Sequence, residues 1–264
     1  MNFRDKVIWI TGASSGIGEQ MAYAFAQAGA KLALSARNEE KLKQVQANCP
    51  AGAEVLLIPL DVSDFSAVQA AGEAVIDHFG YLNLLINNAG ISQRSLVKDT
   101  DFTIDHKIMA VNFFGAVAAT KAVLPTLLKQ QFGQIVVISS VTGKIGTPLR
   151  SAYAASKHAL IGYFDCLRAE LVDDNIEVTV IIPGFINTDV SANALKGDGR
   201  PTGIKGEATK AGMAPDVFAQ KALRAISQGK KEVYIGGFRE WLAMALRRFF
   251  PNLLFRMIAR AKVT

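Results

Sequence analysis

Residues 6–18 of the chain read KVIWITGASSGIG, an apolar run followed directly by a glycine-rich turn. The run predicts a buried strand over Lys6–Thr11, and a helix pattern over roughly Gly16–Ala28 follows the turn. Glycines between a strand and a helix permit a tight turn and let a pyrophosphate approach the helix N-terminus. The spacing is GxxxGxG rather than GxGxxG. In this context we interpret the turn as a dinucleotide-binding loop rather than a plain turn, with contacts from Gly12, Ser14, Ser15, Gly16, Ile17 and Gly18.

Short apolar runs alternate with amphipathic, helix-length stretches along the rest of the chain. They predict six further strands, at Lys31–Ala36, Glu54–Pro59, Leu82–Asn87, Gln134–Ser140, Glu177–Pro183 and Glu232–Ile235. A long helix is expected over Asp101–Lys129, and a substrate loop rich in Gly, Lys and Thr over about 187–213. This alternation is typical of βαβ units. We therefore predict an α/β fold in one domain, residues 1–237: a Rossmann-type, doubly wound parallel sheet of about seven strands with helices on both faces.

The composition fits a globular protein, because 50% of the 264 residues are hydrophobic and 20% are charged. The first six residues lead straight into a strand without a signal-peptide pattern. No uninterrupted apolar run approaches the roughly 20 residues that cross a bilayer as a helix. We therefore expect a cytoplasmic protein.

The net charge of +6 is concentrated at the C-terminus. Against Glu240, the tail holds Arg239, Arg247, Arg248, Arg256, Arg260 and Lys262, which gives +5 there and leaves +1 for the rest. A nearly neutral body argues against a nucleic-acid-binding face. Cys49 and Cys166 lack CxxC spacing and the three histidines are scattered, so neither a disulfide framework nor a metal site is predicted.

The tail, residues 238–264, is an apolar-basic extension that divides near Pro251. In its second half, one side of a helix would hold Asn252, Arg256 and Arg260, with Leu253, Leu254, Met257 and Ile258 opposite. Such a helix suits a membrane interface, here a peripheral contact with the inner face of a membrane. Packing over the substrate mouth or against a second subunit remains an alternative.

A chemical motif, SAYAASK, occupies residues 151–157 at the start of a helix predicted to reach about Val172. Tyr153 and Lys157 lie four residues apart and therefore share a helix face. A phenol with a pKa near ~10 is a poor acid or base at neutral pH, but a neighbouring ammonium lowers that pKa. Ser140, at the end of the preceding strand, can offer a hydroxyl to a substrate oxygen. The pattern indicates an acid–base centre, with a surface helix carrying an unrelated Tyr and Lys as the alternative.

The tip of the second strand decides between two dinucleotides. A carboxylate there binds the ribose 2′-hydroxyl of NAD, whereas an arginine accommodates the 2′-phosphate of NADP. Residues 35–38 read SARN, without an acid, and Glu39 and Glu40 should face solvent in the next helix. Arg37 and Asn38 therefore favour NADP(H) over NAD(H).

Two further loops follow strands whose carboxyl ends should line the ligand crevice. Asp61, just past the third strand and beside Val62, is placed to meet the adenine unless it is merely a solvated loop acid. Residues 87–90 read NNAG and close the fourth strand. Their amides should brace neighbouring strands while Asn88, Ala89 and Gly90 contact the adenosine side.

Taken together, these motifs resemble the short-chain dehydrogenase/reductase family over nearly the whole chain. The matching segments are the loop Thr11–Gly18, Asn87–Gly90 and Tyr153-x-x-x-Lys157. Ser140 stands thirteen residues before Tyr153, the family's usual separation, which favours it over Ser139.

The resemblance also implies roles for residues that spacing alone does not identify. It assigns Asn112, in VNFFG at 111–115, as a fourth catalytic residue beside Ser140, Tyr153 and Lys157. It matches PGFINT at 183–188 to the segment that holds the nicotinamide. Cofactor contacts are accordingly expected from Tyr153, Lys157, Pro183, Gly184, Ile186 and Thr188. The implied chemistry is hydride transfer, in which Tyr153 exchanges the proton on the substrate oxygen and Asn112 holds a water that links Lys157 to solvent.

Within the family, SAR at 35–37 and YIGG at 234–237 resemble the 11β-hydroxysteroid dehydrogenase and related retinoid/steroid reductase branch. The N-terminal anchor common in that branch is not predicted here. The resemblance implies an NADP(H)-dependent enzyme for apolar carbonyls or secondary alcohols, assembled as a homo-oligomer, dimer or tetramer. The alternatives are a 3-ketoacyl reductase and a catalytically idle dinucleotide-binding interaction protein. The complete set of four catalytic residues argues against the idle protein.

Overall fold

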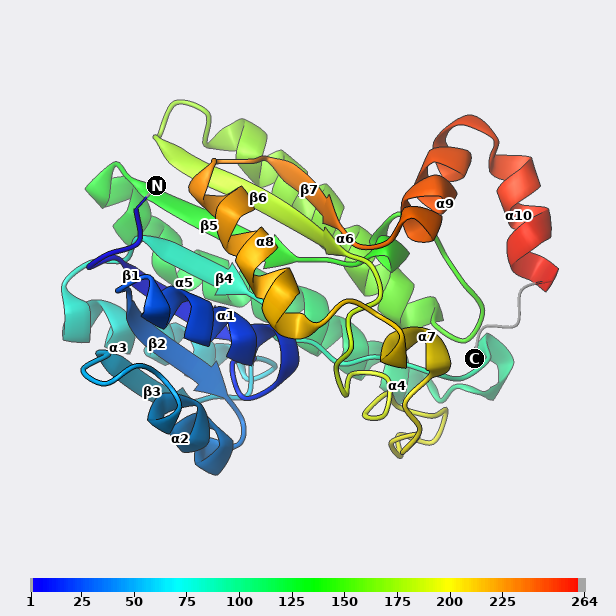
Figure 1. The fold of residues 1–264 in the computed structure, drawn as a ribbon, viewed down its shortest axis with the longest axis horizontal. Coiled ribbons are helices and arrows are strands. Elements are labelled where there is room, and N and C mark those ends of the chain that lie inside the picture. Colours follow the sequence, from blue (N-terminus) through cyan, green and yellow to red (C-terminus); the bar gives the residue numbers. More distant parts are fainter. Residues whose placement is uncertain (1, 261–264) are drawn as a thin grey trace.

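The computed structural model describes residues 2–260, and its strands form one parallel sheet in the order β3-β2-β1-β4-β5-β6-β7 (Figure 1). The strands are β1 (Val7–Thr11), β2 (Lys31–Ala36), β3 (Val55–Pro59), β4 (Leu84–Asn87), β5 (Gly133–Ile138), β6 (Ile176–Pro183) and β7 (Glu232–Ile235). The strand order reverses between β1 and β4, where crevices of doubly wound sheets bind their ligands. The predicted fold class is confirmed.

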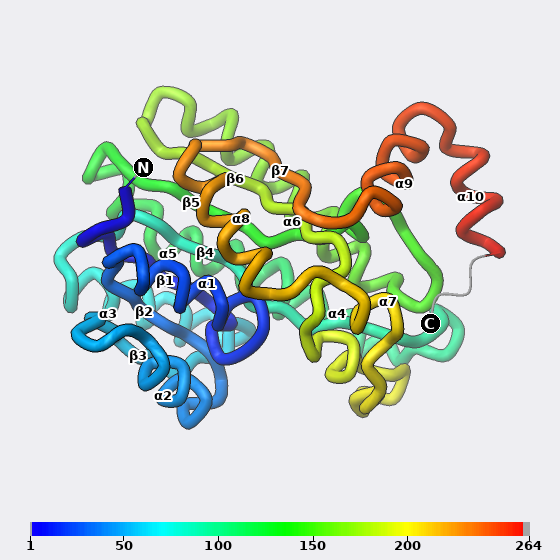
Figure 2. Tube along the Cα trace, viewed as in Figure 1, coloured from blue at the N-terminus to red at the C-terminus, as the bar shows by residue number. Residues whose placement is uncertain are grey.

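Helices cover both faces of the sheet because side chains alternate along each strand. From β1, Ile8 and Ile10 join a core with α1 (Gly16–Gln27), α2 (Glu39–Ala47) and α8 (Pro215–Ser227). Val7 and Trp9 point to the opposite core, formed with α3 (Phe65–Phe79), α5 (Gly115–Gln130) and α6 (Ser151–Glu170). Figure 2 shows α1 and α8 on the near side of the sheet and α5 and α6 behind it.

The long helix predicted over Asp101–Lys129 is interrupted in the structure. It consists of α4 (Phe102–Met109), a π-helical turn η2 (Ala110–Phe114) and α5. By length and composition Phe102–Gln130 would also pass as a membrane-spanning helix, although charged residues such as Lys107 and Lys121 interrupt its apolar runs. Its residues Ala119, Val123 and Leu127 are fully buried in the second core, as in a core helix of a folded domain.

The expected loop over 187–213 is more structured than the sequence predicts. It contains the short helix α7 (Glu207–Lys210), and Leu195 forms a bridge with Gln93 in the segment after β4. That segment also includes the 3₁₀ turn η1 (Val97–Asp99), and a second turn, η3 (Val141–Gly143), follows β5. These loops gather at the carboxyl edge of the sheet (Figure 1).

The tail forms two helices beyond β7, α9 (Phe238–Phe249) and α10 (Pro251–Arg260), which divide at Pro251 as predicted. Figure 1 shows them beside each other as a hairpin past the end of β7. Met1 and residues 261–264, including Lys262 of the predicted basic tail, lie outside the described residues.

Candidate active site

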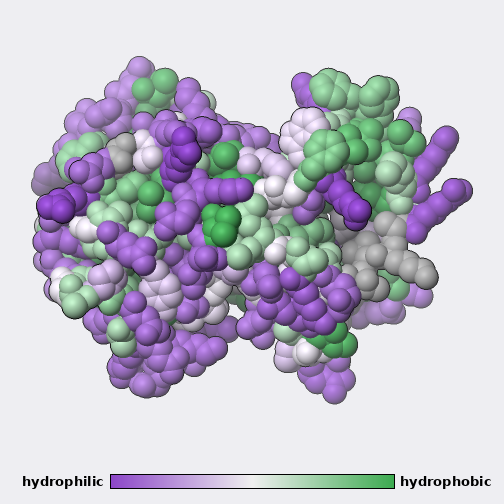
Figure 3. Space-filling view, viewed as in Figure 1, coloured by the Kyte–Doolittle hydropathy of each residue, from purple (hydrophilic) through white to green (hydrophobic). Residues whose placement is uncertain are grey.

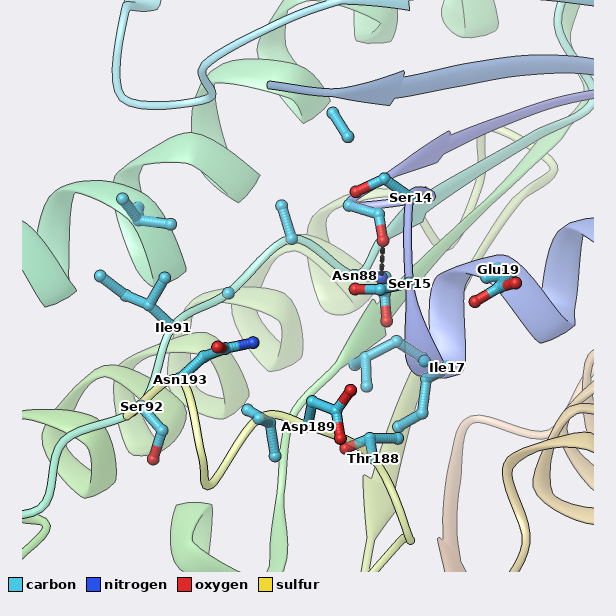
Figure 4. A pocket seen from close by; sticks show the side chains of 18 of the residues that line it. Ser14, Ser15, Ile17, Glu19, Asn88, Ile91, Ser92, Thr188, Asp189 and Asn193 are labelled. Atoms are coloured by element: carbon cyan, nitrogen blue, oxygen red, sulfur yellow. Dashed lines mark hydrogen bonds between the residues drawn. The ribbon is translucent and has the colours of Figure 1, made fainter. Parts of the chain in front are cut away.

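A cleft of about 1090 Å³ lies along the carboxyl edge of the sheet. Nearly all the residues predicted from sequence line it: Gly12, Ser14, Ser15, Gly16, Ile17, Arg37, Asn38, Asp61, Val62, Asn88, Ala89, Gly90, Ser140, Tyr153, Lys157, Pro183, Gly184, Ile186 and Thr188. Figure 4 shows Ser14, Ser15 and Ile17 around the same space as Thr188 and Asp189, with Ile91, Ser92 and Asn193 toward the other end. Gly18 and Asn112 are not among the lining residues.

The glycine-rich loop is built on backbone that side chains would obstruct. Gly12 and Gly16 have φ of +67° and +59°, a left-handed conformation that favours glycine. At Gly18 an added Cβ would lie 2.3 Å from the Gly12 carbonyl oxygen and 2.5 Å from Asn88 Nδ2. Gly18 therefore acts through close packing rather than by lining the cleft. A cradle of this shape, open at the N-terminus of α1, fits a pyrophosphate.

Asn88 braces this cradle from the neighbouring strand. Its Nδ2 donates to the carbonyl oxygens of Thr11 and Gly12, each at 3.0 Å, and its backbone N–H donates to Thr11 Oγ1 at 3.1 Å. The predicted bracing by the amide is confirmed. Because Asn88 also lines the cleft, bracing is compatible with a contact to a ligand.

Two cations lie at the far end of the cleft, at the tip of β2. Arg37 is exposed, and Lys41 lines the same space. Asn38 caps α2 by accepting from the Lys41 backbone N–H at 2.9 Å. Sequence analysis missed Lys41, although it lies in the first turn of the helix that follows Arg37.

Of the acidic groups near Arg37, two pair with another cation and one interacts with Arg37. Glu39 and Glu40 are exposed and pair with Lys43 at 3.1 and 2.9 Å, facing solvent as predicted. Burial raises the pKa of Asp61, but hydrogen bonds from Ser63 outweigh burial and hold that pKa below its ordinary value, with a smaller contribution from Arg37. Asp61 is therefore an ionised hydrogen-bond acceptor that lines the cleft.

Lys157 lies deep in the cleft, one turn of α6 after Tyr153. Its Nζ donates to the Ile138 carbonyl oxygen at 2.8 Å and stands 5.8 Å from the centre of the Tyr153 ring. Only 4% of Lys157 is exposed, and burial lowers its pKa to about 8. At neutral pH the ammonium form therefore still dominates.

The electrostatics of Tyr153 differ from the prediction that Lys157 lowers its pKa. Burial raises the pKa of Tyr153, and the opposing influences are a hydrogen bond with Ser140 and the charge of Arg150. The prediction was wrong for the chain alone because desolvation of the phenolate outweighs the charges around it. Arg150 lies at the N-cap of α6, and its own pKa is lowered by burial and by the nearby Arg94.

Ser139 and Ser140 have different partners. The Ser139 hydroxyl donates to the Lys157 carbonyl oxygen at 3.0 Å and is buried. Ser140 Oγ accepts from the Thr142 backbone N–H at 3.1 Å and interacts with Tyr153. Of the two, the geometry favours Ser140 as the hydroxyl that faces the reacting oxygen.

Asn112 lies behind the cleft in the π-helical turn, a feature frequent at functional sites. Its Oδ1 accepts from the Ile91 backbone N–H at 2.8 Å, and its Nδ2 donates to the Ile91 carbonyl oxygen and to Ser156 Oγ. The Cβ that Gly90 lacks would lie 3.3 Å from Asn112 Oδ1 and 3.6 Å from Lys157 Nζ. Asn112 thus links the segment after β4 to α6, close to Lys157.

The PGFINT segment closes the cleft opposite the glycine-rich loop. Gly184 donates to the Ile235 carbonyl oxygen at 2.9 Å, which continues the pairing of β6 with β7. A Cβ on Gly16 would lie 3.1 Å from Thr188 Cγ2, so the two loops nearly touch. Phe185 donates its backbone N–H to Glu240 Oε1 on α9 at 3.2 Å.

Residues that sequence analysis did not single out line the remaining end of the cleft, among them Ile91, Ser92, Val190, Asn193, Leu195 and Pro201. Val190, Asn193, Leu195 and Pro201 lie in the predicted substrate loop after β6, whereas Ile91 and Ser92 lie in the segment after β4. No chemical motif marks them. The one available signal was the location of both segments after strand ends.

Comparisons with known proteins agree with this geometry. A family model described as short chain dehydrogenase matches residues 6–199. The chain is 43% identical over 267 residues to "Dehydrogenase/reductase SDR family member 7B" of Xenopus tropicalis, covering 98% of this chain and 86% of that protein. It is 43% identical over 263 residues to the protein of the same name from Bos taurus, covering 97% and 81%.

Solved structures show the same architecture. A short chain dehydrogenase/reductase from Burkholderia phymatum in complex with NAD superimposes with a TM-score of 0.84 at 26% identity, covering 96% of both chains. An alcohol dehydrogenase from the archaeon Thermococcus sibiricus, complexed with 5-hydroxy-NADP, gives 0.76 at 27% identity, covering 89% and 97%. The chain belongs to the short-chain dehydrogenase/reductase family, whose members use a nicotinamide dinucleotide to oxidise alcohols or reduce carbonyls.

Proposed function

We propose that the protein is an NADP(H)-dependent oxidoreductase that interconverts an apolar carbonyl compound and its secondary alcohol, with Tyr153 as proton donor and acceptor. The observation that carries the choice of cofactor is the tip of β2, where Arg37 and Lys41 stand without an acid at the strand end. A 2′-phosphate would meet two cations there. A carboxylate that could bind the ribose diol of NAD(H) is missing from the strand tip.

Different parts of the cleft would bind different parts of the cofactor. The pyrophosphate would lie on Gly12, Ser14, Ser15, Gly16 and Ile17, with Asp61 and Val62 beside the adenine and Asn88, Ala89 and Gly90 beneath the adenosine. Pro183, Gly184, Ile186 and Thr188 would hold the nicotinamide end. When bound there, the nicotinamide supplies or accepts a hydride.

The residues of the chain handle the proton and the substrate oxygen. Tyr153 donates its phenolic proton to the oxygen of a carbonyl, or accepts the hydroxyl proton of an alcohol. Ser140, hydrogen-bonded to Tyr153, orients the same oxygen. Lys157, a buried ammonium 5.8 Å from the centre of the Tyr153 ring, would hold the nicotinamide ribose beside Tyr153. Asn112 fixes the segment next to Lys157 and would hold a water through which Tyr153 recovers its proton.

An apolar substrate is supported by the character of the unassigned end of the cleft. Ile91, Val190, Leu195 and Pro201 line it. Behind them, Ile104, Ile108 and Ala152 form a small buried cluster against which Ile91 and Leu195 pack. A hydrocarbon placed there would be removed from water at a gain of about 25 cal/mol per Å² of buried apolar surface.

The proposal is tested by steady-state kinetics with NADPH and NADH on a panel of carbonyls. A charge-assisted phosphate contact contributes roughly 1.5–3 kcal/mol, so the wild type should prefer NADPH by about tenfold to a hundredfold. Arg37→Asp should reverse the preference toward NADH. Lys43→Asp is the matched control, because Lys43 is a nearby cation on α2 that pairs with the solvent-facing Glu39 and Glu40. A wild type that prefers NADH would overturn the assignment.

The same panel separates the two rivals. Turnover confined to 3-ketoacyl thioesters would identify a ketoacyl reductase. Nucleotide binding without turnover of any carbonyl or alcohol would identify an idle dinucleotide-binding protein.

The proposal extends to the enzyme's surroundings. It places the enzyme in the cytoplasm as a homo-oligomer without a nucleic-acid partner, in peripheral contact with the inner face of a membrane through its tail. Light scattering of the purified full chain measures the oligomeric state, and a monomer at micromolar concentration would contradict the homo-oligomer.

A further inference from the structure

The tail hairpin, α9 with α10, is joined to the cofactor cleft at its first turn. Glu240 Oε1 accepts the backbone N–H of Phe185 at 3.2 Å, directly beside Gly184 of the PGFINT segment. A Cβ on Gly184 would lie 3.1 Å from the same Glu240 oxygen. The start of α9 is therefore part of the wall that shapes residues 183–186.

Tyr234 reinforces this junction. Its hydroxyl donates to the Gly237 carbonyl oxygen at 2.6 Å, at the N-cap of α9. Burial and the nearby Glu240 carboxylate raise the pKa of Tyr234 to about 12, so the phenol keeps its proton and remains a donor. This bond ties the N-cap of α9 to β7, three residues before Glu240.

The rest of the hairpin is held much less firmly. In α9 and α10, both described in full, Leu254 is the one fully buried side chain. Met244 packs at the edge of the second core. Arg247 stands 5.0 Å over the Phe255 ring and ties the two helices to each other rather than to the body. The hairpin is thus one unit, anchored mainly at its base.

The outer surface of the hairpin combines exposed aromatic rings with positive charge. Phe238, Trp241, Phe249 and Phe250 are 71%, 50%, 71% and 63% exposed. Five arginines are described there against one acid, Glu240, which leaves +4, and that acid is engaged with Phe185. Figure 3 shows hydrophobic side chains gathered over α9 and α10 beside strongly hydrophilic ones.

An anionic lipid surface fits this combination better than a second copy of the chain. Aromatic and aliphatic side chains enter the headgroup boundary, while arginines meet the lipid phosphates. A second copy of the hairpin would place five arginines opposite five arginines. These would repel one another, because the single acid on each side, Glu240, is already bonded to Phe185.

We propose that an anionic lipid surface binds the α9–α10 hairpin and that Glu240, as a positioning residue, transmits this binding to the cofactor cleft. The inference rests on the proposed cofactor site. A hairpin anchored at one turn samples several orientations, and lipid binding selects the one in which Glu240 holds Phe185. The wall of the nicotinamide end is then organised before the cofactor arrives, so the cofactor binds more tightly.

Coupling between two binding sites is reciprocal, which gives a test that does not depend on turnover. NADP⁺ affinity of the full chain is measured by calorimetry with and without vesicles of phosphatidylcholine and phosphatidylglycerol. Vesicle affinity is measured by co-sedimentation with and without NADP⁺. We expect each ligand to tighten the other by the same factor, about fivefold, at the lower end of typical coupling. Vesicles of phosphatidylcholine alone should neither bind nor change NADP⁺ affinity.

Four variants separate the parts of the proposal. Arg256→Glu with Arg260→Glu should abolish vesicle binding and leave NADP⁺ affinity without lipid unchanged. Lys221→Glu with Arg224→Glu on α8 is the charge-matched control and should retain vesicle binding. Glu240→Ala should retain vesicle binding but lose the coupling, whereas Glu240→Gln, which keeps an acceptor oxygen, should restore it in part. Thermal melts identify any variant that has not folded.

Each remaining outcome rejects a definite statement. Vesicle binding with unchanged NADP⁺ affinity would refute the coupling. No vesicle binding, together with a dimer that dissociates in the Arg256→Glu, Arg260→Glu variant, would make the hairpin a subunit interface. Failure of the chain to bind NADP⁺ under any condition would instead reject the proposed function itself.

Discussion

The cleft has a proposed cofactor end, around residues 12–18, and a proposed substrate end, around Ile91 and Leu195. The two ends are built by different means. At the proposed cofactor end the backbone determines the shape: Gly12 and Gly18 approach their neighbours so closely that a methyl group would not fit, and Gly16 adopts a left-handed φ of +59°. At the substrate end, the segment after β4, the loop after β6 and the tail are held by individual side chains and a few backbone bonds. The cofactor end therefore tolerates little change, whereas the substrate end can be altered without disturbing the sheet.

Gln93 illustrates how the substrate end is assembled. This fully buried side chain donates from Nε2 to Thr100 Oγ1 and Ser151 Oγ, at 3.1 and 3.3 Å, and accepts the Ala152 backbone N–H at 2.9 Å. One amide thus joins the segment after β4 to the first turn of α6, which carries Tyr153. The position of this turn therefore depends on the Gln93 hydrogen bonds.

The largest expected effect lies where the two ends meet, at Tyr153. Tyr153→Phe removes the oxygen that exchanges the proton, so turnover should fall by about 10²–10⁴-fold while NADPH binding is nearly unchanged. Tyr163→Phe on the same helix is the control, since Tyr163 contacts Phe113 and Phe164 through its ring and should tolerate loss of the hydroxyl. Steady-state turnover and nucleotide titration measure the two quantities. Activity of Tyr153→Phe within tenfold of the wild type would remove Tyr153 from the mechanism.

A somewhat smaller effect is expected from a methyl group at the cofactor end. Gly18→Ala places Cβ 2.3 Å from the Gly12 carbonyl oxygen, so the loop must shift. Overpacking of this kind costs about 1–3 kcal/mol, and a loss of 1.4 kcal/mol in binding weakens NADP⁺ affinity about tenfold.

Gly162→Ala is the matched control on α6, because nothing lies within 4 Å of its added Cβ. It should stabilise the protein by about 1 kcal/mol through helix propensity and leave NADP⁺ affinity unchanged. Calorimetry and thermal melts on both variants make the comparison. Equal NADP⁺ affinity in the two would show that the tight backbone at Gly18 is not needed for the cofactor.

Much of the cofactor end could be predicted from the sequence because its determinants are local. A strand, a glycine turn and a helix lie within residues 7–27, and the tip of β2 presents Arg37 next to its own helix. Periodicity likewise located all seven strands to within a few residues. The π-helical turn at residues 110–114 was not predicted, because it does not change the pattern of apolar residues along the helix.

The substrate end could not be predicted in the same way because its contacts join distant residues. The hydrogen bond between Phe185 and Glu240 joins residues 55 positions apart. Nothing in the type of either residue predicts the other as its partner. The pKa of Tyr153 depends on a balance between burial and the charge of Arg150, and burial is a property of the folded chain. Such balances do not follow from the spacing of Tyr153 and Lys157.

Substitution of Arg150 should change the rate of alcohol oxidation at neutral pH several-fold, in a direction that the structure defines. Its charge opposes the effect of burial on the pKa of Tyr153, so Arg150→Met should raise that pKa further. Alcohol oxidation requires the deprotonated phenol, and its rate rises as pH passes through this pKa. The rising limb of the pH–rate profile should therefore move to higher pH, making oxidation slower at neutral pH, while carbonyl reduction persists to higher pH. Arg150→Lys keeps the charge and should leave the profile in place, whereas an unshifted limb in Arg150→Met would assign the limb to another group.

The smallest expected effect concerns the loop over residues 187–213, which we predict to be mobile in the free enzyme and to order over bound ligands. Its base is already attached, since Leu195 accepts the Arg94 backbone N–H and donates to the Ser92 carbonyl oxygen, both at 2.8 Å. Among the described residues its tip is bonded only within the loop, for example from the Ile204 backbone N–H to Thr202 Oγ1 at 3.3 Å, and the Ile204 side chain is 66% exposed. Ligands should therefore slow hydrogen exchange modestly at the tip and very little at Leu195, with β5 amides as an unchanged reference. If the tip exchanges at the same rate with and without NADP⁺ and a substrate analogue, the loop is not a lid, and the substrate end is as rigid as the cofactor end.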